Sequence, residues 1–185
     1  MLGVSQRALG QVSPAIASLR KAVELDGSQP SYKIALGQAL LQADQYQNAY
    51  ELLKPLNMSA MEASLRSSYA LLFAQAATKT NREDEAISVV STQVKADAKN
   101  PRLQRALGAA YSSKGDDGKA FNAFKAAFEI DPKDSSSGSN AVRYMGRQMV
   151  YMAMQEGADI EVWAVERRPN QLEDLTGLNA AEQAG

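Results

Sequence analysis

The chain has 185 residues, of which 45% are hydrophobic, and a formal net charge of −1. This composition supports a sizeable apolar core, and the near-zero charge gives no electrostatic reason to expect nucleic acid or an anionic membrane as a partner. The chain contains no cysteine and no histidine, so it lacks a thiolate nucleophile, the commonest general base and the commonest metal ligand. We therefore expect neither an enzyme nor a cofactor-binding or metal-binding protein.

Targeting and membrane signals are also missing from the sequence. No segment approaches the roughly 18 consecutive apolar residues of a membrane-spanning helix, and no basic stretch followed by an apolar stretch indicates a signal peptide. The absence of cysteine fits an exported bacterial protein slightly better than a cytosolic one. The expected location is therefore the bacterial cytoplasm or periplasm, as a soluble protein.

Helix-start and helix-stop signals occur along most of the chain. Ser13 and Asn100 are expected N-cap residues, and each precedes a proline at the first helical position. The acidic run "REDE", residues 82–85, suits the first turn of a helix, where the helix dipole favours negative charge. We prefer this interpretation to a pair of catalytic carboxylates. Gly115 is a natural helix stop, so "KGDDGKA" is interpreted as a turn between helices and not as a phosphate loop.

The helical segments follow a repeating pattern. One small residue recurs at intervals of 34, 37 and 34 residues, and an alanine follows it by twelve positions every time. The small residues are Gly3, Gly37, Ala74 and Gly108, and the alanines are Ala15, Ala49, Ala86 and Ala120. Two antiparallel helices cannot bury an apolar stripe without neighbouring pairs. We therefore expect a stack of helix pairs that approach closely at the small residues.

The three extra residues of the 37-residue interval lie between Ala49 and Ala74. Pro55 disfavours a continuous helix there, and Ser59 with Glu62 forms the capping-box pattern that starts a new one. The sequence predicts either a lengthened joint from Pro55 to Ser59 or an early start to the following helix.

This pattern resembles the tetratricopeptide repeat (TPR), a helix–turn–helix unit of 34 residues. The fourth unit matches its signature in register at Leu107, Gly108, Tyr111, Ala120, Phe124, Ala127 and Pro132. The second unit has Leu40 where tyrosine is common, and the third has Ala74 in place of glycine. The resemblance covers residues 1–134. It implies an all-α, right-handed α-α superhelical solenoid whose first helices line a concave face.

The expected units are residues 1–29, 30–63, 64–100 and 101–134. The first unit begins midway through its first helix. We therefore expect further repeats before residue 1, or another subunit that covers this end.

The composition changes after Pro132. A flexible polar loop is expected, then an amphipathic capping helix over residues 141–157, and then a short helix and a weakly ordered tail over residues 158–185. Ile160, Trp163 and Ala164 favour a helix over a strand after Gly157. The capping helix contains Met145, Met149, Met152 and Met154, which we interpret as core packing in preference to an adaptable binding surface.

The resemblance also implies which positions face the concave groove. By register these are Ser31, Ile34, Gln38, Leu41 and Gln42 in the second unit, Ser68, Leu71, Gln75, Thr78 and Lys79 in the third, and Arg102, Arg105, Ala109, Ser112 and Ser113 in the fourth. Amide, hydroxyl and apolar groups with two arginines toward one end suit a peptide whose acidic group lies near those arginines. The alternative is that they are ordinary solvated faces.

The function predicted from these features is a non-catalytic scaffold that binds a partner protein or peptide in the groove. The resemblance to bacterial repeat proteins suggests a part in assembling pili, secretion systems or envelope complexes. Ile34 and Gln38 stand where chaperone-binding members carry a lysine and an asparagine, so chaperone binding is not expected. The alternative hypothesis is a structural module that forms a homo-oligomer through its first repeat or its Met-rich helix.

Overall fold

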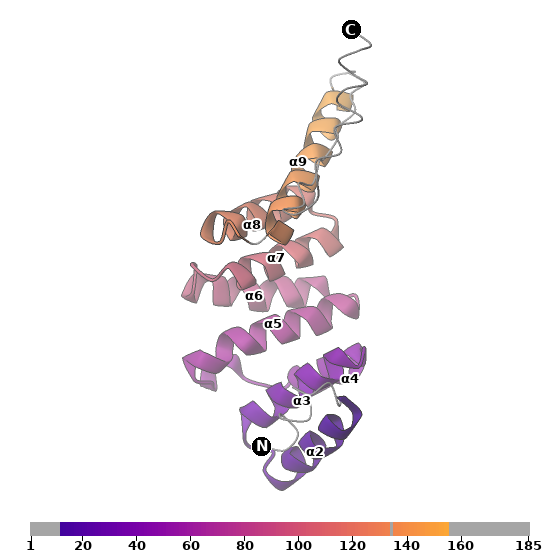
Figure 1. The fold of residues 1–185 in the computed structure, drawn as a ribbon, viewed down its shortest axis with the longest axis vertical. Helices are drawn as coiled ribbons and strands as arrows, with labels where there is room; N and C mark the ends of the chain where they lie inside the picture. The colour runs from indigo at the N-terminus through magenta and orange to yellow at the C-terminus, as the bar shows by residue number, and fades with distance from the viewer. Residues whose placement is uncertain (1–11, 134, 156–185) are drawn as a thin grey trace, which may run out of the picture.

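The computed structural model describes residues 12–133 and 135–155, and all regular structure in these residues is helical. The helices are α2 (Val12–Leu25), α3 (Pro30–Gln42), α4 (Tyr46–Leu53), α5 (Ala63–Lys79), α6 (Glu83–Ala96), α7 (Pro101–Lys114), α8 (Asp117–Ile130) and α9 (Ser135–Gln155), with a 3₁₀ turn η1 at Met58–Ala60. Successive helices run back and forth and stack along one long axis (Figure 1). The predicted α-α solenoid is confirmed.

The stacking follows the repeat. Helices α3 and α4, α5 and α6, and α7 and α8 form successive antiparallel pairs, and each pair contacts the next. The first helices of the pairs also touch one another directly, α3 against α5 and α5 against α7. The first helices therefore form one side of the solenoid, as the repeat pattern implies.

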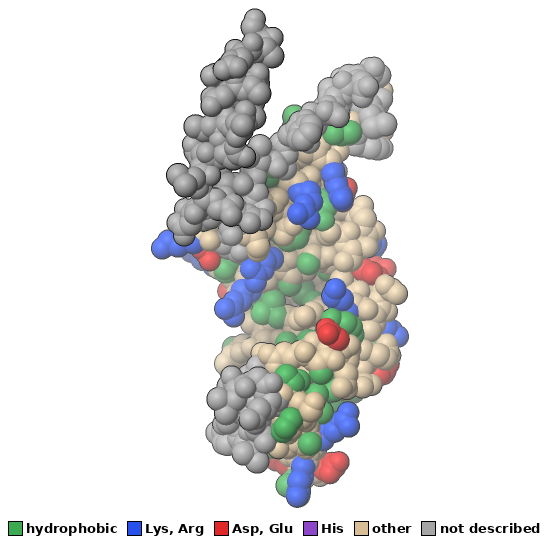
Figure 2. Space-filling model, turned by 45° about the vertical axis from the view of Figure 1, so that its right-hand side comes forward, with side chains coloured by type: hydrophobic (Ala, Val, Ile, Leu, Met, Phe, Trp, Pro, Cys, Tyr) green, Lys and Arg blue, Asp and Glu red, His purple; other side chains and the backbone are tan. Residues whose placement is uncertain are grey.

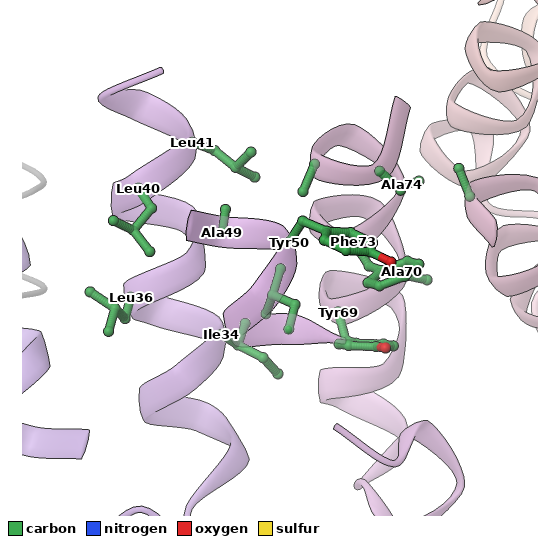
Figure 3. Packing of buried hydrophobic residues seen from close by; sticks show 14 of the residues in the cluster. Ile34, Leu36, Leu40, Leu41, Ala49, Tyr50, Tyr69, Ala70, Phe73 and Ala74 are labelled. Carbon is green, nitrogen blue, oxygen red and sulfur yellow. The ribbon is translucent and has the colours of Figure 1, made fainter. Parts of the chain in front are cut away.

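One apolar core runs continuously from α2 to α7. The rings of Tyr50 and Tyr69 each lie 5.7 Å from the ring of Phe73, centroid to centroid, and this cluster joins α4 to α5 (Figure 3). The buried Tyr50 hydroxyl donates to the Glu85 carboxylate at 3.0 Å and accepts from Lys54 Nζ at 2.7 Å. The polar end of this tyrosine is thus satisfied while its ring fills the core.

A second apolar cluster joins α8 to α9. It contains Ala120, Phe124, Ala141 and Tyr144. The rings of Phe124 and Tyr144 stack with their centroids 5.6 Å apart and their planes 9° from parallel. This stacked pair fixes α9 on the last complete helix pair.

The repeating glycines lie where the two helices of a pair approach most closely. A Cβ at Gly108 would lie 2.9 Å from two ring carbons of Phe124, and one at Gly37 would lie 3.0 Å from Leu53 Cδ2. The third unit has Ala74 and the smaller Val90 at the corresponding positions, and both are buried. The size of the small residue and the size of the residue sixteen positions later therefore vary in opposite directions, which keeps the volume between the two helices filled.

This complementarity predicts that Gly108→Ala lowers the free energy of unfolding by up to about 2 kcal/mol. The added methyl collides with a buried ring at a cost of about 1–3 kcal/mol, which outweighs the roughly 1 kcal/mol gained in helix propensity. In a Phe124→Val background the same change should be neutral or stabilising, because valine stands opposite alanine in the third unit. Urea unfolding followed by circular dichroism measures both effects. Equal effects in the two backgrounds would contradict the prediction.

Most helix ends lie where their signals indicate. Asn100 Oδ1 accepts from the Arg102 amide at 3.2 Å, and Gly115 ends α7 with φ +84°, a conformation that favours glycine. Glu83, Asp84 and Glu85 occupy the first turn of α6. The predicted N-cap at Ser13 was wrong, because α2 already includes Val12 and Ser13.

The insertion lies in the joint between α4 and α5, and both expected alternatives occur together. The chain is non-helical or 3₁₀ over residues 54–62, and α5 has 17 residues against 13 in α3. The predicted capping box at Ser59 is wrong. The Asn57 side chain accepts from the Ser59 amide at 3.0 Å and caps η1, whereas Glu62 is the N-cap residue of α5 without a side-chain bond.

The turn between α7 and α8 depends on Asp116. Its carboxylate accepts from the Lys119 amide at 3.1 Å and from Lys119 Nζ at 2.7 Å. The hydrogen bond from the Lys119 side chain has the largest effect on the pKa of Asp116, and the bond from the Lys119 amide has the next largest. Together they lower this pKa below its usual 3.8. A carboxyl group with a lowered folded-state pKa stabilises the fold above its unfolded pKa and loses that contribution as the pH falls through the folded pKa.

We therefore expect Asp116→Ala to lower the free energy of unfolding by about 1 kcal/mol at pH 7, as the loss of an N-cap does. The difference from the unmodified chain should diminish as the pH falls below 3.8, the usual Asp value. Urea unfolding at a series of pH values measures it, with Asp26→Ala as the control carboxylate. A difference that stays constant down to low pH would contradict the assignment.

Helix α9 differs from its prediction in two ways. It begins at Ser135, six residues before the expected 141, because the small residues of "SSSGS" pack against the preceding elements: Ser137 is fully buried, and a Cβ at Gly138 would lie 3.1 Å from the Phe128 ring. The core interpretation of its methionines is wrong for Met145 and Met149, which are 43% and 45% exposed.

Some expectations fall outside the described residues. These are residues 1–11 of the incomplete first unit and any repeat before it, the side chains of Met152 and Met154, and the short helix and tail over residues 158–185. Over the part of the chain that the structure describes, none of the helices has the length and apolar character needed to cross a membrane.

Candidate binding groove

An open groove of about 940 Å³ lies on the side of the solenoid formed by the first helices. Its lining comes mainly from α5 and α7, with further residues from α6, α8 and α9. The space-filling view shows a hollow in the middle of the molecule with apolar side chains in it and basic side chains beside it (Figure 2).

Helix α5 supplies one wall through Leu71, Gln75, Thr78 and Lys79. These residues are separated by four, three and one positions, so they lie on one face of the helix. The opposite face is fixed in the core by Ala70, Phe73 and Ala77, which are at most 3% exposed. Packing of the buried face therefore turns the polar face toward the groove.

Helix α7 supplies the second wall in the same way. Its groove residues are Arg102, Arg105, Ala106, Ala109 and Ser113. Leu103 and Ala110 lie on the buried face and are fully inaccessible to solvent. Since α5 and α7 are in contact and run in the same direction, their exposed faces form one continuous surface.

The side chains that line the groove carry a net positive charge. Its charged lining residues are Lys79, Arg102, Arg105 and Glu83, so three positive groups less one negative group leave +2 in a chain whose net charge is −1. Arg105 Nη1 donates to Ser136 Oγ of α9 at 3.4 Å, and Lys79 Nζ lies 5.9 Å from the centre of the Tyr46 ring. Arg102 is exposed.

The groove includes residues that the sequence did not indicate. Asn81 and Glu83 lie in it because the turn after α5 reverses the chain at its rim, where Asn81 has φ +58°. Asn140 reaches it from α9. Helix α9 begins earlier than predicted, and this brings Asn140 to the groove. The serine-rich composition of residues 135–139 is typical of a loop, so the sequence did not indicate the early start.

The structure gathers only part of the predicted lining. Leu71, Gln75, Thr78, Lys79, Arg102, Arg105, Ala109 and Ser113 lie together in the groove. Those outside this groove are Ser31, Ile34, Gln38, Leu41, Gln42, Ser68 and Ser112.

Three of the predicted residues that lie outside the groove contribute to the fold. Ile34 and Leu41 are core residues, 6% and 5% exposed, because α3 is covered on more of its circumference than its register alone indicates. The Ser112 hydroxyl forms a hydrogen bond with the Tyr144 hydroxyl and connects α7 to α9. These contacts give the three residues a part in the fold, and their contact with a partner stays a prediction.

The side chains that line the groove are suited to binding a ligand. Its polar groups are amides, hydroxyls, two guanidinium groups, one ammonium group and one carboxylate, with Leu71, Ala106 and Ala109 as apolar contacts. In the described residues no cluster of three or more acidic, histidine or cysteine side chains is arranged to hold a metal ion. Such a set can bind an anionic, partly apolar ligand.

Comparison with known proteins agrees with this architecture. A family model described as tetratricopeptide repeat matches residues 106–134, and one described as anaphase-promoting complex, cyclosome, subunit 3 matches residues 8–93. Residues 106–134 are thus a tetratricopeptide repeat, which makes the chain a TPR protein. No curated protein matches the sequence of this TPR protein.

Solved structures share the fold of this TPR protein. A crystal structure of MamA is 18% identical with a TM-score of 0.69, and the match covers 84% of this chain and 90% of that one. MamA from Desulfovibrio magneticus RS-1 is 18% identical with a TM-score of 0.68, covering 84% and 86%. A thermophilic TPR protein from Thermus thermophilus is 20% identical with a TM-score of 0.64, covering 99% and 95%.

Family membership places the chain among protein-interaction scaffolds, which are typically non-catalytic. In these solenoids stacked helix pairs form an extended concave surface. The groove of this TPR protein lies on the side formed by the first helices of the pairs, mainly at α5 and α7.

Proposed function

We propose that this TPR protein binds a partner protein by holding an acidic peptide segment of it in the groove between α5, α7 and α9. The observation that carries the proposal is the +2 charge of the lining, formed by Lys79, Arg102 and Arg105 against Glu83. A guanidinium group can donate two parallel hydrogen bonds to one carboxylate, which gives both affinity and orientation.

The remaining lining supports a peptide over a small ion. Amide side chains of Gln75, Asn81 and Asn140 can pair with main-chain groups, and Leu71 and Ala109 provide apolar contact between the polar groups. The volume of about 940 Å³ is at the upper end for small-molecule sites, and the groove is open along the solenoid. An extended or helical segment of several residues fits such a surface.

We place this binding in the assembly of bacterial protein complexes, such as pili, secretion systems or envelope complexes. The support for this role is the resemblance to bacterial repeat proteins, together with the absence of cysteine. It is tested by the identity of the proteins that the intact chain retains from bacterial lysates. Retention dominated by soluble metabolic enzymes would count against it.

Selection of peptides from a random library on the immobilised full chain tests the proposed ligand class. We expect the selected peptides to be enriched in aspartate and glutamate, and the enrichment to vanish on the Arg102→Glu/Arg105→Glu variant. Arg20→Glu/Lys21→Glu is the matched control, since it changes the net charge equally at two exposed positions of α2. Neutral or basic peptides selected equally by all three proteins would refute the proposal.

A further inference from the structure

Helix α9 presents two different faces. Ser137, Ala141 and Tyr144 are buried and face the preceding elements. Val142, Met145 and Met149 are 43%, 43% and 45% exposed. Their spacing of three and four residues places these three on one side of the helix, and we call them the outer stripe. Three large apolar side chains in a row form a contiguous patch and not scattered surface residues.

Helix α9, which carries the outer stripe, projects beyond the last complete pair (Figure 1). Helix α9 makes its extensive contacts with α8. Helices α3, α5 and α7 each pack against a preceding and a following helix. Helix α9 thus has the position of a first helix, without a following helix among the described residues.

The chain itself supplies a segment of the right chemistry directly after α9. Thirty residues follow Gln155, and Gly157 comes two positions after it, where glycine commonly permits the chain to reverse. Ile160, Trp163 and Ala164 then recur at the spacing of one helical face. Trp163 stands six residues after Gly157 and Met149 stands eight before it. At about 1.5 Å per residue they would lie at similar heights in an antiparallel pair.

The charges beside the outer stripe can be compared with those of the segment after Gly157. Arg143 and Arg147 are exposed on α9 beside the outer stripe, and Arg147 already pairs with Asp117 at 3.7 Å. The segment after Gly157 carries Asp159, Glu161 and Glu166, and its two basic residues, Arg167 and Arg168, come only at its far end. Acidic residues on the covering segment would therefore face a basic border, whereas a second copy of α9 would bring these arginines against each other.

We propose that residues 158–168 fold back at Gly157 as a helix and cover the outer stripe of α9, with Trp163 against Met149. This would give the solenoid one further helix pair after α7 and α8. It would also brace the groove, because α9 contributes Asn140 to the lining and is bonded to α7 through Tyr144 and Ser112. The proposal does not depend on the ligand proposed above.

Trp163 is the only tryptophan in the chain, so its fluorescence reports on this segment alone. In the full-length protein at low concentration, we expect emission at shorter wavelength than in the urea-unfolded chain and several-fold weaker quenching by acrylamide. Met145→Glu/Met149→Glu should shift the emission to longer wavelength and raise quenching several-fold. Met145→Leu/Met149→Leu should preserve the protection, and so should Leu25→Glu, which changes an apolar residue that is 80% exposed on α2.

Light scattering and hydrogen exchange complete the test. We expect a monomeric mass at every concentration, and amides of residues 158–168 protected from exchange as strongly as those of α9. Protection of Trp163 that appears only together with a dimeric mass would instead assign the outer stripe to a second copy. A tryptophan as accessible as in the unfolded chain, unprotected amides, or fluorescence unaffected by Met145→Glu/Met149→Glu in a folded protein would each overturn the proposal.

Discussion

Replacing Phe124 with alanine should lower the free energy of unfolding by about 3–5 kcal/mol. Phe124 is 3% exposed, lies against Gly108 and stacks on Tyr144. Its removal therefore leaves a cavity where α7, α8 and α9 meet. Folded domains are stable by only about 5–15 kcal/mol, so the loss is a large fraction of the total.

The matched control is Phe128→Ala, which makes the same substitution one turn later in α8. Phe128 is 39% exposed, so we expect a cost nearer 1 kcal/mol. Urea unfolding followed by circular dichroism measures both variants, and hydrogen exchange shows whether the loss is concentrated in α7 to α9. Similar costs for the two phenylalanines would show that the junction of these helices is not a centre of stability.

Reversing both arginines of the groove should abolish most of its affinity for an acidic peptide. A hydrogen bond to a charged group is worth about 1.5–3 kcal/mol. The loss of two such bonds, with repulsion added, predicts at least about a hundredfold increase in the Kd of a selected peptide for Arg102→Glu/Arg105→Glu. Titration calorimetry or fluorescence anisotropy measures this change. The affinity of the unmodified chain should fall as salt is added, because salt screens exposed charges.

Arg20→Glu/Lys21→Glu separates the local effect from that of net charge and should leave the Kd within a few-fold. The salt dependence should be much weaker for Arg102→Glu/Arg105→Glu than for the unmodified chain. An unchanged Kd after the double reversal would place the binding surface elsewhere on the solenoid. We expect the double variant to remain folded, because Arg102 is exposed and Arg105 is only half-buried.

The sequence by itself determined the repeating part of the molecule. The spacing of Gly37, Ala74 and Gly108 predicts where helices approach, and the structure places Leu53 and Phe124 directly against the two glycines. Such local patterns are reliable because every unit imposes the same steric requirement on its own pair of helices. The groove residues of α5 and α7 were likewise predictable, since the buried face of each helix fixes the orientation of its exposed face.

The tertiary structure alone decided the features that depend on contacts between units. Residues 135–140 have the composition of a loop, yet they are helical because Ser137 and Gly138 pack against earlier helices. This early start brings Asn140 into the groove. Met145 and Met149 have the composition of a core, yet they face outward. A helical period shows that a helix has an apolar face, but which side is covered depends on the neighbours that the fold places beside it.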